Sequence, residues 1–223
     1  AGIIYSPETS SILIMESEGS SNSNASILEG VSINLHEDFE GLFSIQADNF
    51  NALNSAFHPQ DNRFFYLDER LDRLIIIPEQ VNGLPELFDQ SSDFVSLDSL
   101  QIENSQGITF DPISGSIFIL DAGKLEMIKV YPGLTNSFDI ADPFTQTRIE
   151  RFSLRDLNNP QLRGVAYNPN NQHLYIGSAS QDFIYELTED GQFVSSLDIA
   201  ALNLENLQSL FFADSVDQTD DPF

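Results

Sequence analysis

The chain has 223 residues, 41% of them hydrophobic, which is enough to bury one sizeable core and too few to require two domains. Its 35 acidic and 9 basic residues give a formal net charge of −26, which argues against nucleic acid and anionic lipid as partners. The absence of cysteine excludes disulfides and thiol chemistry, and no apolar run is long enough to insert into a membrane.

Short segments typical of β-strands follow one another along the chain. The first unit begins with GIIYSP, carries a small polar insertion at residues 16–26, and ends with VSINL and GLFSI. The second unit runs through RFFYLDE, RLIIIPE and DFVSLDSL, and the third through IFILDA, EMIKVYP and ERFSLRDL. Runs of this length, rich in β-branched and aromatic residues and separated by turn residues, predict strands.

The fourth unit, residues 163–199, shows the pattern most clearly. GVAY, LYIGS, FIYEL and FVSSLDI are predicted as four successive strands, with turns at NPNN and TEDG. Asp190 and Gly191 in the second turn tolerate the positive φ that tight hairpins require. Four antiparallel strands that meander in this way form one blade of a β-propeller.

The same unit recurs with starts near residues 2, 54, 107, 164 and 209, at intervals that suit propeller blades with insertions. An aromatic residue follows each start by three positions, at Tyr5, Phe57, Phe110, Tyr167 and Phe212. A proline follows in four of the five units, and the last strands share FSI, VSL, FSL and SSL at residues 43, 95, 152 and 195. A β-sandwich, the alternative fold, gives no reason for such repeats.

We therefore predict an all-β chain with one β-propeller domain over residues 1–223, built from four-stranded antiparallel blades. Four blades and the first strand of a fifth are visible in the sequence. Because a propeller closes its ring by pairing its ends, these units would leave unpaired edges. We expect them to be a fragment of a longer chain, with five or six blades when complete.

One set of candidate metal ligands lies where the second strands end. Glu16, Asp68, Asp121 and Ser178 each follow the proline of their unit by nine residues. In a ring these positions share one rim, so the three carboxylates are candidate Ca²⁺ ligands in the central channel. The alternative is that each acid accepts hydrogen bonds from the next turn of its own blade.

A second candidate cation site lies near the end of the sequence. It consists of Asp214, Asp217, Asp220 and Asp221, whose spacing does not match an EF-hand loop. An acidic surface insertion is the alternative. The three histidines, His36, His58 and His173, fall at different blade positions, so no catalytic residue is predicted.

The stretch GVAYNPNNQHLYIGSASQDFIYEL resembles repeats of the NHL and gluconolactonase/regucalcin-like propellers. FIYELTEDGQFVSSLDIAALNLENLQSLFFADSVDQTDDP is similar to propeller repeats of large secreted bacterial, often cyanobacterial or marine, calcium-associated surface proteins. The resemblance implies an extracellular, cell-surface or periplasmic location. In the enzymatic relatives, a channel metal orients a hydrolysable ester or lactone; only Glu16, Asp68 and Asp121 match by register, while Ser178 departs from that pattern.

Three functions follow from these observations, and the third of them is a purely structural spacer. The first is a non-catalytic binding or scaffold module, whose rim loops hold a protein or glycan partner or the remaining portion of a larger chain. The second is a Ca²⁺-dependent hydrolase of esters, lactones or phosphoesters, with the metal in the channel. Ca²⁺ is the one cofactor that the sequence suggests.

Overall fold

The computed structural model describes residues 2–6, 11–19, 25–34, 39–48, 52–58, 60, 62–68, 73–78, 93–133, 148–158, 161–204 and 207–213. Within these ranges the chain forms four sheets of four strands, and each sheet is an antiparallel meander in sequence order. We call these sheets blades 1 to 4. No helix in the described ranges is long and apolar enough to cross a membrane.

The strands of each blade are numbered along the chain. Blade 1 comprises β1 (Gly2–Ser6), β2 (Ser11–Gly19), β3 (Ala25–Asn34) and β4 (Phe39–Asp48). Blade 2 comprises β5 (Ala52–His58), β6 (Arg63–Asp68), β7 (Arg73–Pro78) and β8 (Asp93–Ser96). Blade 3 comprises β9 (Ser105–Phe110), β10 (Ile117–Asp121), β11 (Glu126–Val130) and β12 (Ile149–Ser153). Blade 4 comprises β13 (Leu162–Asn168), β14 (His173–Ser178), β15 (Phe183–Thr188) and β16 (Phe193–Asp198).

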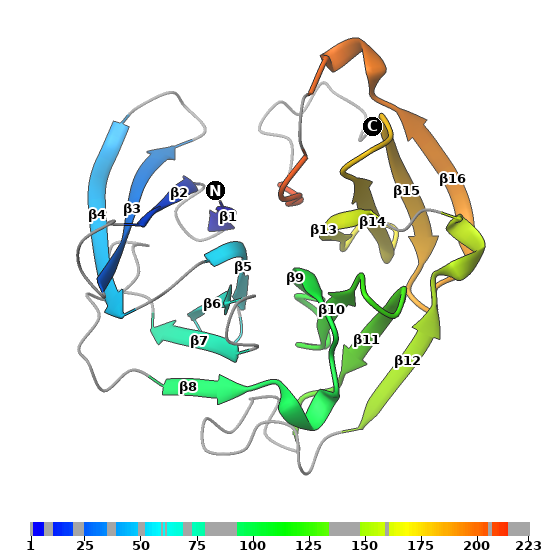
Figure 1. Ribbon diagram of the computed structural model, residues 1–223, viewed down its shortest axis with the longest axis horizontal. Coiled ribbons are helices and arrows are strands. Elements are labelled where there is room, and N and C mark those ends of the chain that lie inside the picture. Colours follow the sequence, from blue (N-terminus) through cyan, green and yellow to red (C-terminus); the bar gives the residue numbers. More distant parts are fainter. Residues whose placement is uncertain are drawn as a thin grey trace.

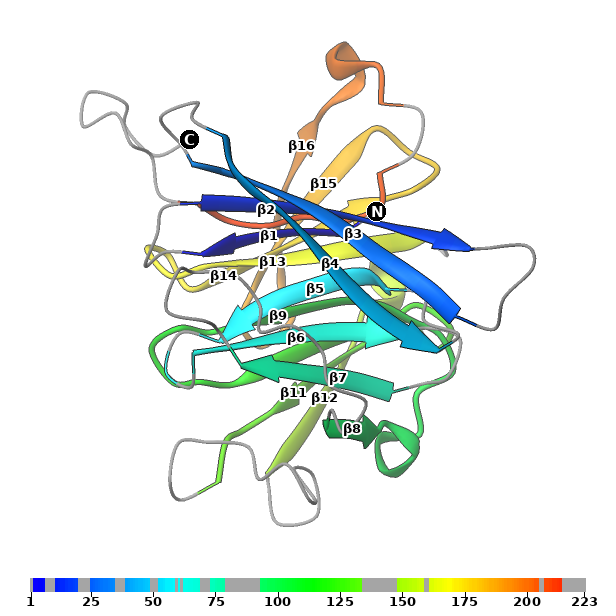
Figure 2. The same ribbon diagram turned by 90° about the vertical axis from the view of Figure 1, so that its left-hand side faces the viewer.

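The four blades stand around a common axis, with the first strand of each blade innermost (Figure 1). β1 packs beside β5, β5 beside β9, and β9 beside β13. Seen from the side, β3 and β4 are inclined to β1, as expected for a twisted blade (Figure 2). The predicted propeller of four-stranded blades is confirmed, whereas the blade number of the whole protein stays a prediction.

The repeat starts lie beside one another around the axis. A Cβ atom on Gly107 would lie 3.0 Å from Cγ1 of Val165, and one on Gly164 would lie 3.0 Å from Cα of Ser209. Gly164 also has a φ of +64°, which favours glycine. Glycine at the repeat start therefore permits close packing of the inner layer, which residues 207–213 continue past β13.

The proline turns share one hydrogen-bonding pattern. The Asp111 carbonyl accepts from the Gly115 N–H at 2.8 Å, and the Asn168 carbonyl accepts from the Gln172 N–H at 2.9 Å. Gly115 and Gln172 both have positive φ, at +72° and +61°. In the TEDG turn, positive φ is found at Gly191 (+84°) but not at Asp190. The proline turn, unlike the TEDG turn, thus requires a residue with positive φ four positions after its Asp or Asn.

A further repeat follows the last strand of blades 2, 3 and 4. Short 3₁₀ helices η1 (Asp98–Leu100), η2 (Arg155–Leu157) and η3 (Ala200–Leu202) each end at a left-handed residue. Aligning these helices matches Leu97 and Leu154 with Ile199. The expected alignment of SSL with VSL and FSL is therefore wrong by two residues.

Apolar side chains fill the boundaries between blades. One buried cluster joins blades 2 and 3, and another joins blades 3 and 4. The rings of Phe65 and Phe110 lie 4.8 Å apart across the first boundary. Those of Phe118 and Tyr167 stack at 5.6 Å across the second. The repeated aromatic register therefore serves contacts between neighbouring blades.

Candidate functional site

Asp121 ends β10, as its repeat position predicts, and its carboxylate is completely buried. Its two oxygens accept hydrogen bonds from four backbone N–H groups at 3.0 to 3.2 Å, those of Glu103, Asn104, Gly123 and Lys124. Four such donors satisfy a carboxylate without a metal. Two of these donors, Gly123 and Lys124, lie in the turn that follows β10, where the alternative to metal binding places them.

The other predicted channel ligands are described to different extents. Asp68 is fully buried at the end of β6 and forms an ion pair with Arg73 at 3.0 Å. Ser178 ends β14 and accepts a 2.9 Å hydrogen bond from the Gln181 N–H. Only the backbone of Glu16 is described, and the prediction that Glu16 ends its strand is wrong, because β2 continues to Gly19. Ca²⁺ binding by Glu16, Asp68 and Asp121 stays a prediction.

The second predicted cation site, Asp214, Asp217, Asp220 and Asp221, lies outside the described residues, as does His36. His58 contacts the Gly115 carbonyl at 3.2 Å, and Nδ1 of His173 lies 2.8 Å from Glu186. In the ranges that the structure describes, no three His, Cys, Asp or Glu side chains are grouped so that they could hold a metal.

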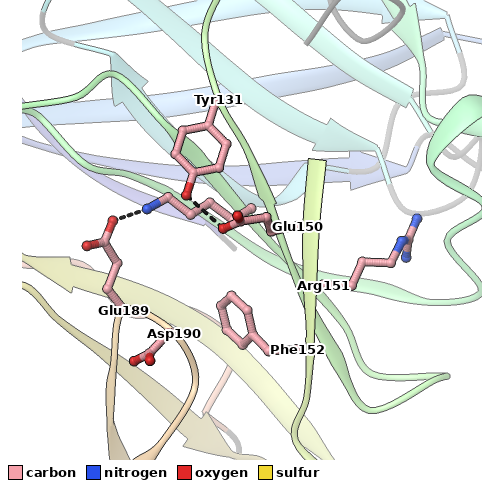
Figure 3. A pocket seen from close by; sticks show the side chains of 7 residues that line it. Tyr131, Glu150, Arg151, Phe152, Glu189 and Asp190 are labelled. Atoms are coloured by element: carbon pink, nitrogen blue, oxygen red, sulfur yellow. Dashed lines mark hydrogen bonds and ion pairs between the residues drawn. The ribbon is translucent and has the colours of Figure 1, made fainter. Parts of the chain in front are cut away.

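A hollow of about 500 Å³ lies at the outer part of the boundary between blades 3 and 4. We call it the inter-blade hollow. β11, β12 and the turn between β15 and β16 contribute its lining side chains, which are Lys129, Tyr131, Glu150, Arg151, Phe152, Glu189 and Asp190. Figure 3 shows Tyr131 and Glu150 above Phe152, Glu189 and Asp190 to its left, and Arg151 apart from them on the right.

Three polar pairs hold the side chains of the inter-blade hollow in place. Lys129 donates a hydrogen bond to Glu189 and so links blade 3 to blade 4. The Tyr131 hydroxyl donates to Glu150 at 2.7 Å. Arg148 forms a second ion pair with Glu150. Each pair restricts side-chain rotation before a ligand arrives, which favours binding because less entropy remains to be lost.

The electrostatics of the inter-blade hollow follow from these pairs. Burial alone would lower the pKa of Lys129, but the hydrogen bond and the charge of Glu189 outweigh it and raise that pKa. The hydrogen bond from Tyr131, followed by the charge of Arg148, lowers the pKa of Glu150. Burial raises the pKa of Tyr131. At neutral pH the hollow therefore presents a hydroxyl, an ammonium and several carboxylates.

The packing under the hollow depends on the β15–β16 turn. A Cβ atom on Gly191 would lie only 2.3 Å from the Phe152 ring, so the turn rests directly on that ring.

In blade 2 the position equivalent to Lys129 is Ile76, because Ile76 pairs with Phe65 as Lys129 pairs with Phe118. Our sequence prediction missed this site; a lysine amid the apolar third strand EMIKV was its one visible signal.

Comparison with known proteins identifies the family. The model of the family described as SdiA-regulated matches residues 22–210. The chain belongs to the SdiA-regulated family. No curated protein matches it at a significant level. The remaining comparison of this member of the SdiA-regulated family is therefore with solved structures.

The solved structures similar to this member of the SdiA-regulated family include propellers. The periplasmic gluconolactonase of Pseudomonas aeruginosa has a TM-score of 0.55 at 8% identity, with 88% of this chain and 56% of that chain covered. A candidate 6-phosphogluconolactonase from Bacteroides uniformis has a TM-score of 0.53 at 10% identity, with 88% and 56% covered. A chain of the nidogen/laminin complex has a TM-score of 0.53 at 15% identity, with 83% and 62% covered.

These similarities confirm the resemblance to gluconolactonase-like and NHL propellers. At 8% to 15% identity they show the fold alone. The SdiA-regulated chain spans 56% to 62% of the length of these three structures. The similarity to calcium-associated bacterial surface proteins stays a prediction.

Proposed function

We propose that this member of the SdiA-regulated family is a non-catalytic propeller module that binds a glycan in the inter-blade hollow. The observation that carries the proposal is the hollow itself, about 500 Å³ in volume, which combines an aromatic ring with hydrogen-bonded charged groups. Its volume lies within the range of small-molecule sites. The β15–β16 turn that forms one wall is an outer loop, in keeping with the sequence prediction that loops carry binding.

The lining groups match the chemistry of a sugar. A sugar hydroxyl both donates and accepts, so it can donate to a carboxylate of Glu189 or Asp190 and accept from the Lys129 ammonium. The Phe152 ring, half-buried at the base, offers an apolar surface to sugar C–H groups. The hollow has three carboxylates and the Lys129 ammonium, while the Arg151 guanidinium donates to the Leu100 carbonyl, so the lining favours a neutral ligand over an acidic one.

The hydrolase alternative rests on the similarity to two lactonase structures, which share the fold at 8% to 10% identity. Against it, the oxygens of Asp121 are already hydrogen bonded to backbone N–H groups. A metal would have to displace several of these donors in order to bind there. We therefore favour binding over hydrolysis.

The test is calorimetric titration of the protein with maltotetraose, cellotetraose and chitotetraose, with trigalacturonate as the acidic comparison. We expect saturable binding of at least one neutral oligosaccharide, and a loss of about tenfold or more in affinity in Phe152→Ala, which removes the ring, and in Glu150→Gln. Phe193→Ala, which removes an exposed ring outside the hollow, is the matched control.

Each result of this titration is decisive. Absence of saturable binding by every oligosaccharide, or binding that Phe152→Ala and Glu150→Gln leave intact, would overturn the glycan site. Circular dichroism of each variant shows whether a lost affinity reflects lost folding. Ca²⁺-dependent hydrolysis of glucono-1,5-lactone by the intact protein would instead support the alternative.

A further inference from the structure

Equivalent apolar positions become progressively more exposed from blade 2 to blade 4. The third residue before each 3₁₀ helix is Val95 in blade 2, Phe152 in blade 3 and Leu197 in blade 4. Val95 is 5% exposed, Phe152 is half-buried, and Leu197 is 60% exposed. The change follows the order of the blades, so the surroundings differ while the position within the blade is the same.

The end of each 3₁₀ helix shows the same series. Leu100 of η1 is 0% exposed, Leu157 of η2 is half-buried, and Leu202 of η3 is 64% exposed. Leu100 belongs to the same buried cluster as Ile108 and Phe110 of the following blade. Leu157 packs against the cluster that contains residues of blade 4. Each blade therefore covers these positions on the blade before it.

The inner part of blade 4 is already covered in this way by residues 207–213. A Cβ atom on Gly177 would overlap Leu207, whose Cδ2 would lie 1.8 Å away. Arg163 donates to the Gln208 side chain at 2.5 Å. These contacts place the segment where the innermost strand of a following blade belongs.

The register of the segment supports the same placement. Ser209 contacts Gly164 of blade 4. In the same way, Gly164 and Val165 of blade 4 contact Gly107 of blade 3. In this register Leu210 and Phe212 occupy the positions of Val165 and Tyr167 in blade 4. The inner layer of a fifth blade is therefore present, while Leu197 and Leu202 further out remain exposed.

We propose that the open outer face of blade 4 is the docking face for three further β-strands of the same polypeptide, which complete a fifth blade with residues 207–213. In all four described blades the strands run outward in sequence order. The strands that cover Leu197 and Leu202 therefore come from the polypeptide after residue 213. A partner from another chain would need to enter beside a segment that already occupies the inner position.

The chemistry of the missing strands follows from how blade 4 covers blade 3. β14 contributes Leu174 and Ile176 to the shared cluster, and β15 contributes Tyr185 and Leu187. The covering strands are thus expected to carry apolar residues at alternate positions, two per strand. Burying the exposed leucines in this way removes apolar surface from water, which makes the association favourable.

The polar groups on this face are compatible with burial. Glu186 accepts hydrogen bonds from Tyr175 at 2.9 Å and Ser195 at 2.6 Å, and Nδ1 of His173 lies 2.8 Å from it. All of these groups belong to blade 4 itself. Since blade 4 satisfies the Glu186 carboxylate internally, the covering strands need not supply a cation.

Thiol labelling tests the proposal, because the chain has no cysteine of its own. Leu197→Cys and Leu202→Cys are introduced singly into the protein at its natural length. Ile113→Cys, at a turn residue that is 65% exposed, is the matched control. We expect maleimide labelling of the folded protein to be at least about tenfold slower at 197 and 202 than at 113, because a covered thiol reacts only after local opening. Equal rates would overturn the proposal.

Photo-crosslinking then identifies what covers the face. p-Benzoylphenylalanine replaces Leu197 in the natural-length protein, and irradiated samples are digested and analysed by mass spectrometry. Crosslinks within one chain to peptides after residue 213 are expected. Crosslinks to a second copy or to another protein, or a failure to crosslink at all, would overturn the assignment to the same polypeptide. Circular dichroism confirms that each variant is folded.

Discussion

Lys129 of β11 and Glu189 in the β15–β16 turn form an ion pair that joins blade 3 to blade 4. The Lys129 side chain is 9% exposed and that of Glu189 is 31% exposed, so the two partners differ in their access to water. Loss of the glutamate strands a buried charge, whereas loss of the lysine leaves a carboxylate that water can reach.

This asymmetry predicts unequal effects of two substitutions. Glu189→Gln is expected to lower the free energy of unfolding by about 1–2 kcal/mol, less than for a fully buried pair because solvent screens Glu189. Lys129→Met keeps most of the apolar contact and is expected to change the free energy of unfolding by less than about 1 kcal/mol. Urea denaturation at neutral pH measures both, with Arg148→Met at an exposed pair as control. A larger loss in Lys129→Met than in Glu189→Gln would contradict the argument.

A second prediction concerns Glu186 and pH. Hydrogen bonds from His173 and then from Ser195 lower the pKa of Glu186 below its ordinary value of 4.5. A carboxyl group with a lowered pKa in the folded state stabilises the fold above its unfolded pKa, and this contribution is lost as pH falls through the folded value. The free energy of unfolding is therefore expected to decrease below about pH 4.5.

Glu186→Gln removes this titrating group. The variant is expected to be less stable than the wild type at neutral pH and to lose less stability on acidification. Urea denaturation over a pH series gives both slopes, and Glu103→Gln, an exposed glutamate outside this network, is the control. Parallel curves for the wild type and Glu186→Gln would show that the carboxylate does not contribute.

The repeating parts of the fold could be predicted because each blade makes the same contacts. Phe110 and Tyr167 share a register since both meet an aromatic ring of the preceding blade. The turns at Asp111 and Asn168 repeat because both side chains accept a backbone N–H two residues later. Such local requirements are written into every repeat, so one sequence displays them several times.

The inter-blade hollow could not be predicted in the same way, because it depends on one departure from the repeat. Lys129 occupies a position that is apolar in blade 2, and its partner Glu189 lies 60 residues further along the chain. Likewise, the sequence placed Asp121 correctly at a strand end but left open whether its carboxylate faces a metal or backbone N–H groups. Only the path of the chain around the carboxylate decides between these roles.

A third prediction separates the two roles of Asp121. Asp121→Ala leaves four backbone N–H groups without their acceptor and is expected to lower the free energy of unfolding by about 2–4 kcal/mol. The loss is expected to be equal in EDTA and in Ca²⁺ at matched ionic strength. Thermal unfolding measures it, with the exposed Asp98→Ala as control. A rise in Tm with Ca²⁺ that Asp121→Ala abolishes would support the channel metal instead.

A fourth prediction concerns Gly164, where β13 meets residues 207–213. Alanine there must adopt a φ of +64° and place its Cβ 2.9 Å from the Leu210 nitrogen. The left-handed backbone alone costs about 1 kcal/mol, and the contact forces the segment away from β13. Gly164→Ala is therefore expected to lower the free energy of unfolding by about 1–3 kcal/mol.

Hydrogen exchange distinguishes this local displacement from a general loss of stability. In Gly164→Ala the amides of residues 207–213 are expected to exchange faster, while those of β10 and β11, away from this contact, change only as far as global stability requires. Asn203→Gly, at a left-handed residue with a φ of +49°, is the control and should change stability by less than about 0.5 kcal/mol. Unchanged exchange at Leu210 in Gly164→Ala would show that the segment does not depend on close packing against β13, and would remove one support for the fifth blade.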